Sequence, residues 1–327
     1  MKIKALTLAV AAASAFPVAA MAAGPIDGSV YGKVNVSMVN ADDGSDDQWE
    51  LNSNASRIGF KGKTKLSDNL YAIYKLEYET SVDDGEKDGQ TFTQRNIMGG
   101  LTGGFGTNWA GKHDTPTKMA QNKIDLFNDL EGDLKNTFEG ENRVNNIVAY
   151  TTPMLGDAIS ITVAGVFGEG DSGSKVGEVG DKNDGVDGTS VSINYETDNL
   201  YLALAADQDI DGQDLVRAVG QWKIENLQLG LMYQQSESNI DSDIKDEDGW
   251  FVSAAYKIDK VKLKAQYGKI EDDADGDEEE TFSIGADYKL GDNTKLFAFY
   301  TENTDEDGGS SSEDENDYFG LGMEHKF

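Results

Sequence analysis

Residues 227–234 read LQLGLMYQ and residues 261–268 read VKLKAQYG, so that apolar side chains occupy every second position. The same alternation recurs in residues 30–38, 200–205 and 281–288. Successive side chains of a β-strand point to opposite faces, whereas an amphipathic helix repeats its apolar positions every three or four residues. The period of two therefore predicts a chain built from strands that each carry one apolar face.

Two kinds of connector alternate between these segments. Short connectors with the composition of tight turns lie at residues 67–69, 197–199, 225–226, 258–260 and 291–293. Long connectors rich in glycine and acidic residues lie at residues 41–47, 82–89, 169–188, 207–214, 237–249, 271–280 and 304–317. Short turns at one end and long loops at the other are typical of an up-and-down barrel. From the strands between Gly28 and Phe327 we predict an all-β fold, a 16-stranded antiparallel transmembrane barrel with strands of about 9 to 11 residues.

The composition excludes several classes of function. The 327 residues include 28 Lys and Arg against 60 Asp and Glu, a net charge of −32, which has the wrong sign for binding nucleic acid. The chain has no cysteine and only two histidines, His113 and His325, so it lacks the groups for disulfides, thiolate metal sites or histidine-based catalysis. We expect no cofactor, no metal centre and no enzymatic activity.

The N-terminal segment is predicted to be a targeting signal. It contains Lys2 and Lys4, then an apolar run, and it ends in AMA at residues 20–22, a small-residue cleavage site. The apolar run is shorter than the roughly 18 residues that a spanning helix needs. We therefore expect residues 1–22 to be a cleaved signal peptide and residues 23–327 to form one barrel domain.

A soluble, secreted barrel or sandwich would show the same alternation, but two features favour a membrane barrel. Aromatic residues recur near strand ends, where the membrane interfaces would lie, as at Tyr31, Trp49, Tyr201 and Trp250. The last predicted strand also ends the chain on Phe327. Together with the signal peptide, these features favour the outer membrane of a Gram-negative cell.

Short motifs give the chain a family resemblance. They are VYGK at residues 30–33, SRIGFKG at 56–62, QR at 94–95, ENRV at 141–144 leading to Tyr150, and the terminal Phe327. In this order and spacing they make the mature chain similar to the general trimeric porins of Gram-negative outer membranes. The resemblance implies a 16-stranded barrel, a homotrimer, and a third extracellular loop folded inward to narrow the pore.

Arginine is scarce in this chain and its positions follow a pattern. The arginines are Arg57, Arg95, Arg143 and Arg217, and the first three fall on the second, fourth and sixth predicted strands. A lipid-facing arginine at the middle of the bilayer would cost about 2–4 kcal/mol, so the lumen is the favoured side. The alternative interpretation is that these arginines are solvated or contact another subunit.

Strand parity predicts the direction of several basic side chains. Arg57 and Arg143 should point inward, because Ile58 and Val144 beside them take the lipid-facing parity. Lys33 is inward by the alternation of its strand.

The parity of Arg95 is open, because Ile97 and Leu101 share its face. Arg217 is predicted inward, although it lies outside the resembling motifs. In similar porins such positions form a basic ladder at the pore constriction, which the resemblance implies for Lys33, Arg57, Arg95 and Arg143.

The inward loop is predicted to be Thr115–Gly140. Unlike the other long connectors it carries many apolar residues, which would let it pack against a wall: Met119, Ile124, Leu126, Phe127, Leu130, Leu134 and Phe138. Its acids include Asp125, Asp129, Glu131 and Asp133. The resemblance implies that acids of this loop face the basic ladder across the constriction.

Opposed rows of charge would favour small hydrophilic solutes, so the predicted function is passive diffusion of ions and such solutes through a water-filled channel. The net negative charge predicts a preference for cations. The expected partners are two further copies of the chain, outer-membrane lipid and lipopolysaccharide, and divalent cations held weakly by acidic loops. A substrate-specific channel and a non-conducting surface barrel, such as an adhesin or an outer-membrane enzyme, remain alternatives.

Overall fold

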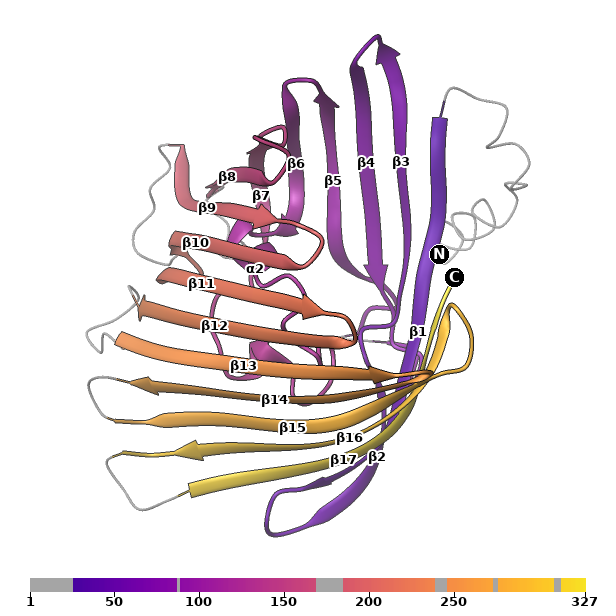
Figure 1. Ribbon diagram of the computed structural model, residues 1–327, viewed down its shortest axis with the longest axis vertical. Helices are drawn as coiled ribbons and strands as arrows, with labels where there is room; N and C mark the ends of the chain where they lie inside the picture. The colour runs from indigo at the N-terminus through magenta and orange to yellow at the C-terminus, as the bar shows by residue number, and fades with distance from the viewer. Residues whose placement is uncertain (1–25, 87–88, 169–184, 239–245, 273–275, 309–312) are drawn as a thin grey trace, which may run out of the picture.

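A computed structural model describes residues 26–86, 89–168, 185–238, 246–272, 276–308 and 313–327. The predicted signal peptide, residues 1–22, lies outside the described residues. The described chain forms seventeen strands in one antiparallel sheet (Figure 1): β1 (Ile26–Asp42), β2 (Asp47–Ser53), β3 (Arg57–Ser67), β4 (Leu70–Glu79), β5 (Thr93–Gly103), β6 (Gly106–Asp114), β7 (Arg143–Thr151), β8 (Ile159–Phe167), β9 (Val186–Glu196), β10 (Leu200–Ile210), β11 (Gln213–Ile224), β12 (Leu227–Ser238), β13 (Asp246–Ile258), β14 (Val261–Asp272), β15 (Glu278–Lys289), β16 (Thr294–Glu306) and β17 (Glu313–Lys326).

The sheet closes on itself as a barrel. The first strand, β1, pairs with β17 on one side and with both β2 and β3 on the other. Since β2 and β3 share one partner, they are two segments of a single barrel strand, and the described residues form sixteen. At the seam the backbone N–H groups of Gly32 and Phe327 each donate to the other's carbonyl, at 3.0 and 3.1 Å. The prediction of a 16-stranded antiparallel barrel is confirmed.

The break between β2 and β3 is held by side chains. Ala55 takes a left-handed conformation, with φ of 48°, and interrupts the ladder. The Ser56 hydroxyl accepts from the Asn35 N–H and donates to the Asn35 carbonyl, at 2.9 and 3.1 Å, so both groups of β1 keep a partner. Arg57, the first residue of β3, donates to the Ala55 carbonyl at 2.9 Å, and the break thereby fixes its direction.

The two faces of the sheet differ as the alternation predicts. Large apolar side chains point outward and are exposed, for example Leu204 at 61% and Leu231 at 56%. Polar side chains such as Gln234 and Ser283 point inward and are buried. An apolar exterior around a polar interior suits a barrel surrounded by lipid. No helix in the described part of the chain is long and apolar enough to cross a membrane.

Two aromatic residues differ from the prediction. Tyr31 and Tyr201 were expected at the membrane interfaces, but both point into the barrel. The Tyr31 hydroxyl donates to Glu77 at 2.8 Å, and the Tyr201 hydroxyl donates to the Ala120 carbonyl at 2.9 Å. Their rings follow the inward parity of their strands, so a hydrogen-bond partner in the lumen satisfies each hydroxyl.

One connector expected to be long is a tight turn. Strand β10 continues to Ile210 and β11 begins at Gln213, so only Asp211 and Gly212 join them. Both residues have positive φ, 56° and 74°, as a two-residue hairpin turn requires. Several strands also exceed the expected length, since β13 has 13 residues and β17 has 14. Strands therefore occupy part of what the sequence presents as acidic loops.

The inward loop, Thr115–Gly140, folds into the barrel as expected (Figure 1). It contains helix α2 (Pro116–Ala120) and the short 3-10 helix η2 (Leu134–Asn136). Its buried apolar side chains, at most 2% exposed, are Ile124, Phe127, Leu134 and Phe138. They pack against Met232, Phe251 and Ile270 of β12–β14 and against Phe297 and Phe299 of β16. Of the other predicted residues, Leu126 and Leu130 are partly buried against the same cluster, and Met119 is 38% exposed.

Carboxylates oppose each other across strands at the long-loop end of the barrel. Glu271 of β14 faces Asp248 of β13 on one side and Glu278 of β15 on the other. Like charges directly opposite each other destabilise a sheet. We expect Glu271→Gln to stabilise the barrel by about 0.2–1 kcal/mol at low ionic strength. The gain should vanish near 1 M NaCl, where the screening length is about 3 Å.

Urea unfolding of the barrel in lipid, followed by tryptophan fluorescence, measures this effect. Asp198→Asn removes one charge from an exposed short turn and serves as the control. A gain for Glu271→Gln that persists unchanged at high salt would rule out charge repulsion as its cause.

Candidate pore constriction

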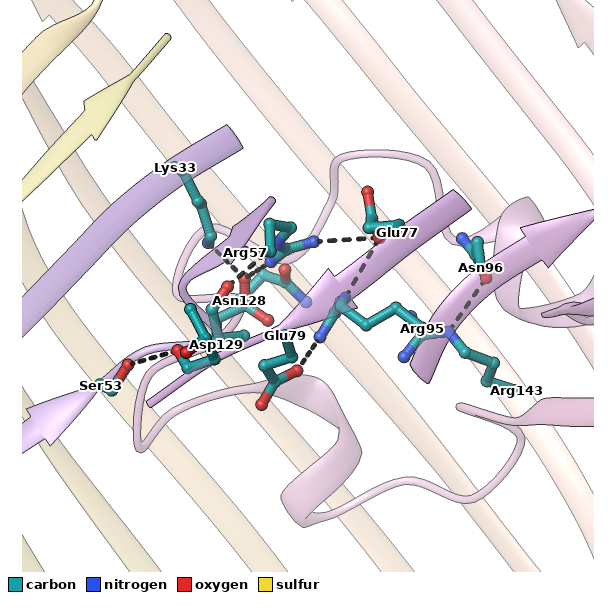
Figure 2. Close-up of polar contacts among 12 residues, drawn as sticks. Lys33, Ser53, Arg57, Glu77, Glu79, Arg95, Asn96, Asn128, Asp129 and Arg143 are labelled. Atoms are coloured by element: carbon teal, nitrogen blue, oxygen red, sulfur yellow. Dashed lines mark hydrogen bonds and ion pairs between the residues drawn. The ribbon is translucent and has the colours of Figure 1, made fainter. Parts of the chain in front are cut away.

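The centre of the candidate site is Asp129 at the tip of the inward loop. One of its carboxylate oxygens, Oδ2, accepts from Lys33 Nζ of β1 and from Arg57 Nη2 of β3, both at 2.6 Å. The loop therefore reaches across the lumen and contacts the basic wall at this point (Figure 2). Burial alone would raise the pKa of Asp129, but Arg57 and Lys33 outweigh it, and the pKa lies below its ordinary value. Asp129 is thus ionised at neutral pH.

Arg95 joins the row because of a β-bulge. The pairing of β4 with β5 slips between Leu76 and Tyr78, so β5 has one residue more than β4 over this stretch. The extra residue frees Arg95 from the face of Ile97 and turns it toward the lumen. Its Nε lies 3.2 Å from Glu77 Oε1, and its Nη1 contacts Glu79. Arg95 therefore pairs with carboxylates of the wall (Figure 2).

A second bulge affects Arg143. The pairing of β6 with β7 slips between Gly111 and His113, and Asn146 has a φ of 53°. Because of the slip, Val144 is fully buried, and the prediction that it faces lipid is wrong.

Arg143 itself lies at the end of the row (Figure 2). Its Nη2 is 2.8 Å from Asp114 Oδ1 of β6, and its Nε donates to Asn96 Oδ1 of β5 at 3.0 Å. Asn96 Nδ2 donates in turn to the other oxygen of Asp114 at 2.7 Å. The last cation of the ladder is therefore held by a carboxylate and an amide of the neighbouring strands.

Wall carboxylates that the sequence analysis missed complete the site. Glu77 is 5% exposed and also lies 3.9 Å from Arg57 Nη1 and 3.6 Å from Lys75 Nζ. Together with Asp129, four wall acids lie within 4.0 Å of the four ladder cations: Glu77, Glu79, Asp114 and Glu324. Glu77 and Glu79 are two residues apart in a strand, and this spacing was the available signal. The local charges of the constriction are nearly balanced.

The other predicted loop acids do not contact the ladder. Asp125 accepts from the backbone N–H groups of Phe127 and Leu134, at 2.9 and 3.1 Å. Burial, followed by the nearby Asp133, raises the pKa of Asp125. Asp133 accepts from the Asp129 N–H at 2.7 Å and so holds that residue in place.

Glu131 takes a third position, accepting from Asn52 of β2 at 3.0 Å. Of the four predicted loop acids, Asp129 alone touches the basic ladder among the residues that the structure describes. Asp125 and Asp133 stabilise the loop from within, and Glu131 ties it to the wall.

The inward loop is fastened to the opposite wall, on β9–β16. Gln266 of β14 accepts from the Leu126 N–H at 2.9 Å and donates to the Gly132 carbonyl at 2.6 Å. Ser253 of β13 donates to the Ile124 carbonyl at 2.6 Å. Between the loop tip and the ladder wall lies a cavity of about 510 Å³ whose lining includes Lys33, Arg57, Glu77 and Asp129.

Arg217 points inward as predicted, but it fastens the loop instead of joining the ladder. It is fully buried on β11, with Nη1 2.6 Å from Glu141 Oε1. Its Nη2 donates to the Glu139 carbonyl at 2.6 Å and its Nε donates to Gln234 at 2.9 Å. Each of the three guanidinium nitrogens therefore has a partner. Arg217 therefore fixes the point where the loop returns to the barrel.

Comparison with known proteins gives consistent matches. A family model described as Gram-negative porin matches residues 7–308. Outer membrane porin protein 32 of Delftia acidovorans is 33% identical over 172 residues, 48% of this chain and 47% of that protein. The chain thus spans about half the length of this curated relative. Porin-like protein L of Photobacterium profundum is 24% identical over 353 residues, covering 99% of both.

Solved structures share the fold. An anion-selective porin from Comamonas acidovorans has a TM-score of 0.77 at 20% identity, over 92% of this chain and all of that one. OmpT of Vibrio cholerae, in a trimer form, has a TM-score of 0.71 at 17% identity, over 92% of this chain and 99% of that one.

Removing the charge of Asp129 should alter ion selectivity. Asp129→Asn leaves Lys33 and Arg57 without their shared carboxylate, so the constriction gains positive charge. We expect the reversal potential in a salt gradient to move toward anions in planar lipid bilayers. Asp68→Asn is the matched control, since Asp68 also pairs with a lysine, Lys65 at 2.8 Å, but is 94% exposed in a short turn. Equal shifts in both variants would contradict a role for Asp129 at the constriction.

Breaking the Arg217–Glu141 pair should loosen the loop. Arg217→Met leaves a buried carboxylate short of its main partner, which costs about 3–5 kcal/mol in comparable buried pairs. We expect urea unfolding at lower denaturant concentration and faster proteolysis within the loop. The double variant Arg217→Met with Glu141→Leu removes both charges and should recover much of the loss. Equal destabilisation of the single and double variants would assign the effect to lost packing.

Proposed function

The chain belongs to the Gram-negative porin family, and from this premise we propose that it forms a water-filled channel for passive diffusion of ions and small hydrophilic solutes. It is a protein of the outer membrane. The carrying observation is the contact of Asp129 of the inward loop with Lys33 and Arg57 of the basic ladder, beside a cavity of about 510 Å³ lined by the same charged residues. Enzymatic alternatives are set aside, because a porin is a channel protein. Export by the signal peptide of residues 1–22 is part of the proposal.

The mechanism follows from charge held in a narrow polar passage. Ladder cations on one side and carboxylates among and across from them create a field transverse to the direction of flow. Water and dipolar solutes can orient in this field, whereas apolar molecules would lose hydration without gaining partners. The side chains of Gln234, Ser283 and Thr301 face the lumen and extend its polar surface along the barrel. Passage is then governed by size and polarity.

We propose a weak preference for cations. The constriction itself is nearly neutral, so the mouths of the channel influence selectivity more than its centre. At the long-loop end, carboxylates line the strand ends, as in the pairs Glu247–Asp272 and Glu279–Asp305. Such a mouth concentrates cations ahead of the constriction. The anion selectivity in the name of the Comamonas protein belongs to that protein.

The proposed assembly is a homotrimer in an asymmetric membrane. The trimer form of the Vibrio OmpT structure, which has the same fold, supports this assembly. The exposed apolar outer face, with Leu204 and Val216 among its members, would contact lipid and neighbouring subunits. The acidic long-loop end would meet lipopolysaccharide, with divalent cations bridging the two sets of negative groups.

Planar bilayer recordings test the proposed function. The refolded mature chain should give stepwise conductance and, in a tenfold KCl gradient, a small reversal potential of the cation sign. Sugar uptake into liposomes should fall steadily with sugar size, without saturation by any one sugar. A reversal potential of the anion sign would overturn the cation preference, and a barrel that inserts without conducting would overturn the channel.

A further inference from the structure

Positive charge gathers at the short-turn end of the lumen. A cavity of about 260 Å³ at this end is lined by six lysines, here called the lysine vestibule: Lys257, Lys260, Lys262, Lys289, Lys295 and Lys326. Only three carboxylates line the same cavity: Asp287, Asp292 and Glu324. In a chain with 28 basic and 60 acidic residues, a cavity in which lysines outnumber acids is a local reversal of charge.

The lysine vestibule is continuous with the constriction. Lys295, Glu324 and Lys326 line both this cavity and the larger one that contains Lys33 and Asp129. Strand parity agrees, because Lys257 and Lys262 are paired in register and lie on the lumen-facing side of β13 and β14. The vestibule is therefore a section of the pore itself.

The wall beside the vestibule, beyond β1, is basic as well. Lys61 and Lys63 of β3 lie over the rings of Tyr31 and Tyr71, with Nζ 5.0 and 4.0 Å from the ring centres. Lys75 of β4 stands opposite Lys61 in the register. Lysines of β3, β4 and β13–β17 thus line one side of the lumen between the constriction and the short turns.

Part of this positive charge has no local counterion. Lys295 and Lys326 each have a carboxylate at 3.0 Å, from Asp287 and Glu324. In the part of the chain that the structure describes, no carboxylate lies within 4.0 Å of Lys257, Lys260 or Lys262. Their charge is free to attract mobile anions.

The opposite end of the barrel carries the opposite sign. A cavity of about 420 Å³ among the long-loop ends of β10–β13 is lined by no lysine or arginine and by six carboxylates, here called the acidic rim: Asp207, Asp214, Glu237, Asp246, Glu247 and Asp248. The cross-strand acidic pairs of β13–β16 continue this charge around the mouth. Cations accumulate at such a surface.

We propose that the channel is electrically polarised along its axis and rectifies ionic current. This proposal rests on the channel function proposed above and adds a direction to it. The acidic rim holds mainly cations, the lysine vestibule holds mainly anions, and the constriction lies between them. A voltage that is positive on the long-loop side drives both populations toward the constriction, which fills with carriers. The reverse voltage draws both away, and the carriers are depleted.

Salt concentration gives the inference its first test. At about 0.03 M KCl the screening length of roughly 17 Å spans much of the lumen, whereas at 1 M it is about 3 Å. At low salt and about 100 mV, we expect the current with the long-loop side positive to be roughly twice the current with that side negative. At 1 M KCl we expect the two currents to be equal. Equal currents at low salt, or a larger current in the reverse direction, would overturn the proposal.

The orientation of each channel must be known. The chain has no cysteine, so Asp198→Cys in an exposed short turn provides a unique attachment point. A bulky polyethylene glycol maleimide added to one chamber should react only when the short turns face that chamber. Channels are sorted by this reaction after their current–voltage curve has been recorded.

Paired variants test the residues. Replacing Lys257, Lys260 and Lys262 together by glutamine should cut the excess of forward over reverse current by at least half. Replacing the same three by arginine keeps the charge and should keep the rectification. Rectification that survives the glutamine variant unchanged would overturn the role of the vestibule.

The outcomes separate the two proposals. A channel that conducts symmetrically at low salt contradicts the inference and leaves the diffusion function standing. A barrel that does not conduct contradicts both. If the glutamine variant fails to refold, the current–voltage curves of the wild type and of the arginine variant still test the proposal. Loss of rectification in the arginine variant, which keeps the charge, would contradict an electrostatic origin.

Discussion

A strand that crosses a membrane must satisfy all its backbone hydrogen bonds within the protein, and this constraint governs the structure. The seam between β1 and β17 meets it by closing the sheet, so that β1 pairs along both its edges. In a closed barrel, the side chain of each strand residue points either outward to lipid or inward to the lumen. The same two-residue period that makes Leu229 and Leu231 face outward therefore places Gln234 and Lys33 in the pore.

Parity explains how far the sequence alone could go. It predicted the barrel, the apolar exterior and the inward direction of Lys33 and Arg57, because the alternation is regular along β1 and along β3 from Arg57 onward. Where one extra residue shifts the period, parity left the direction of Arg95 open and was wrong for Val144. A bulge leaves little trace in sequence, since it depends on the partner strand as much as on its own residues.

The acids of the site were harder to predict for a different reason. A loop without regular structure has backbone N–H groups that need acceptors, and Asp125 and Asp133 supply them. Composition cannot distinguish an acid that binds its own loop from one that faces the pore. The wall acid Asp114 was missed because an isolated carboxylate in a strand gives no sign of the cation that a neighbouring strand places beside it.

The one-sided attachment of the inward loop has a consequence for the shape of the passage. Hydrogen bonds from Ser253 and Gln266 and the buried Arg217 hold the loop against one wall, while the two acids Asp129 and Glu131 reach the other. We therefore expect the passage to lie off the barrel axis, along the ladder wall, where the cavity beside Asp129 is found. For a permeating molecule the limiting dimension is its thickness, so a flat ring can pass edge-on where a compact branched molecule of equal mass is held back.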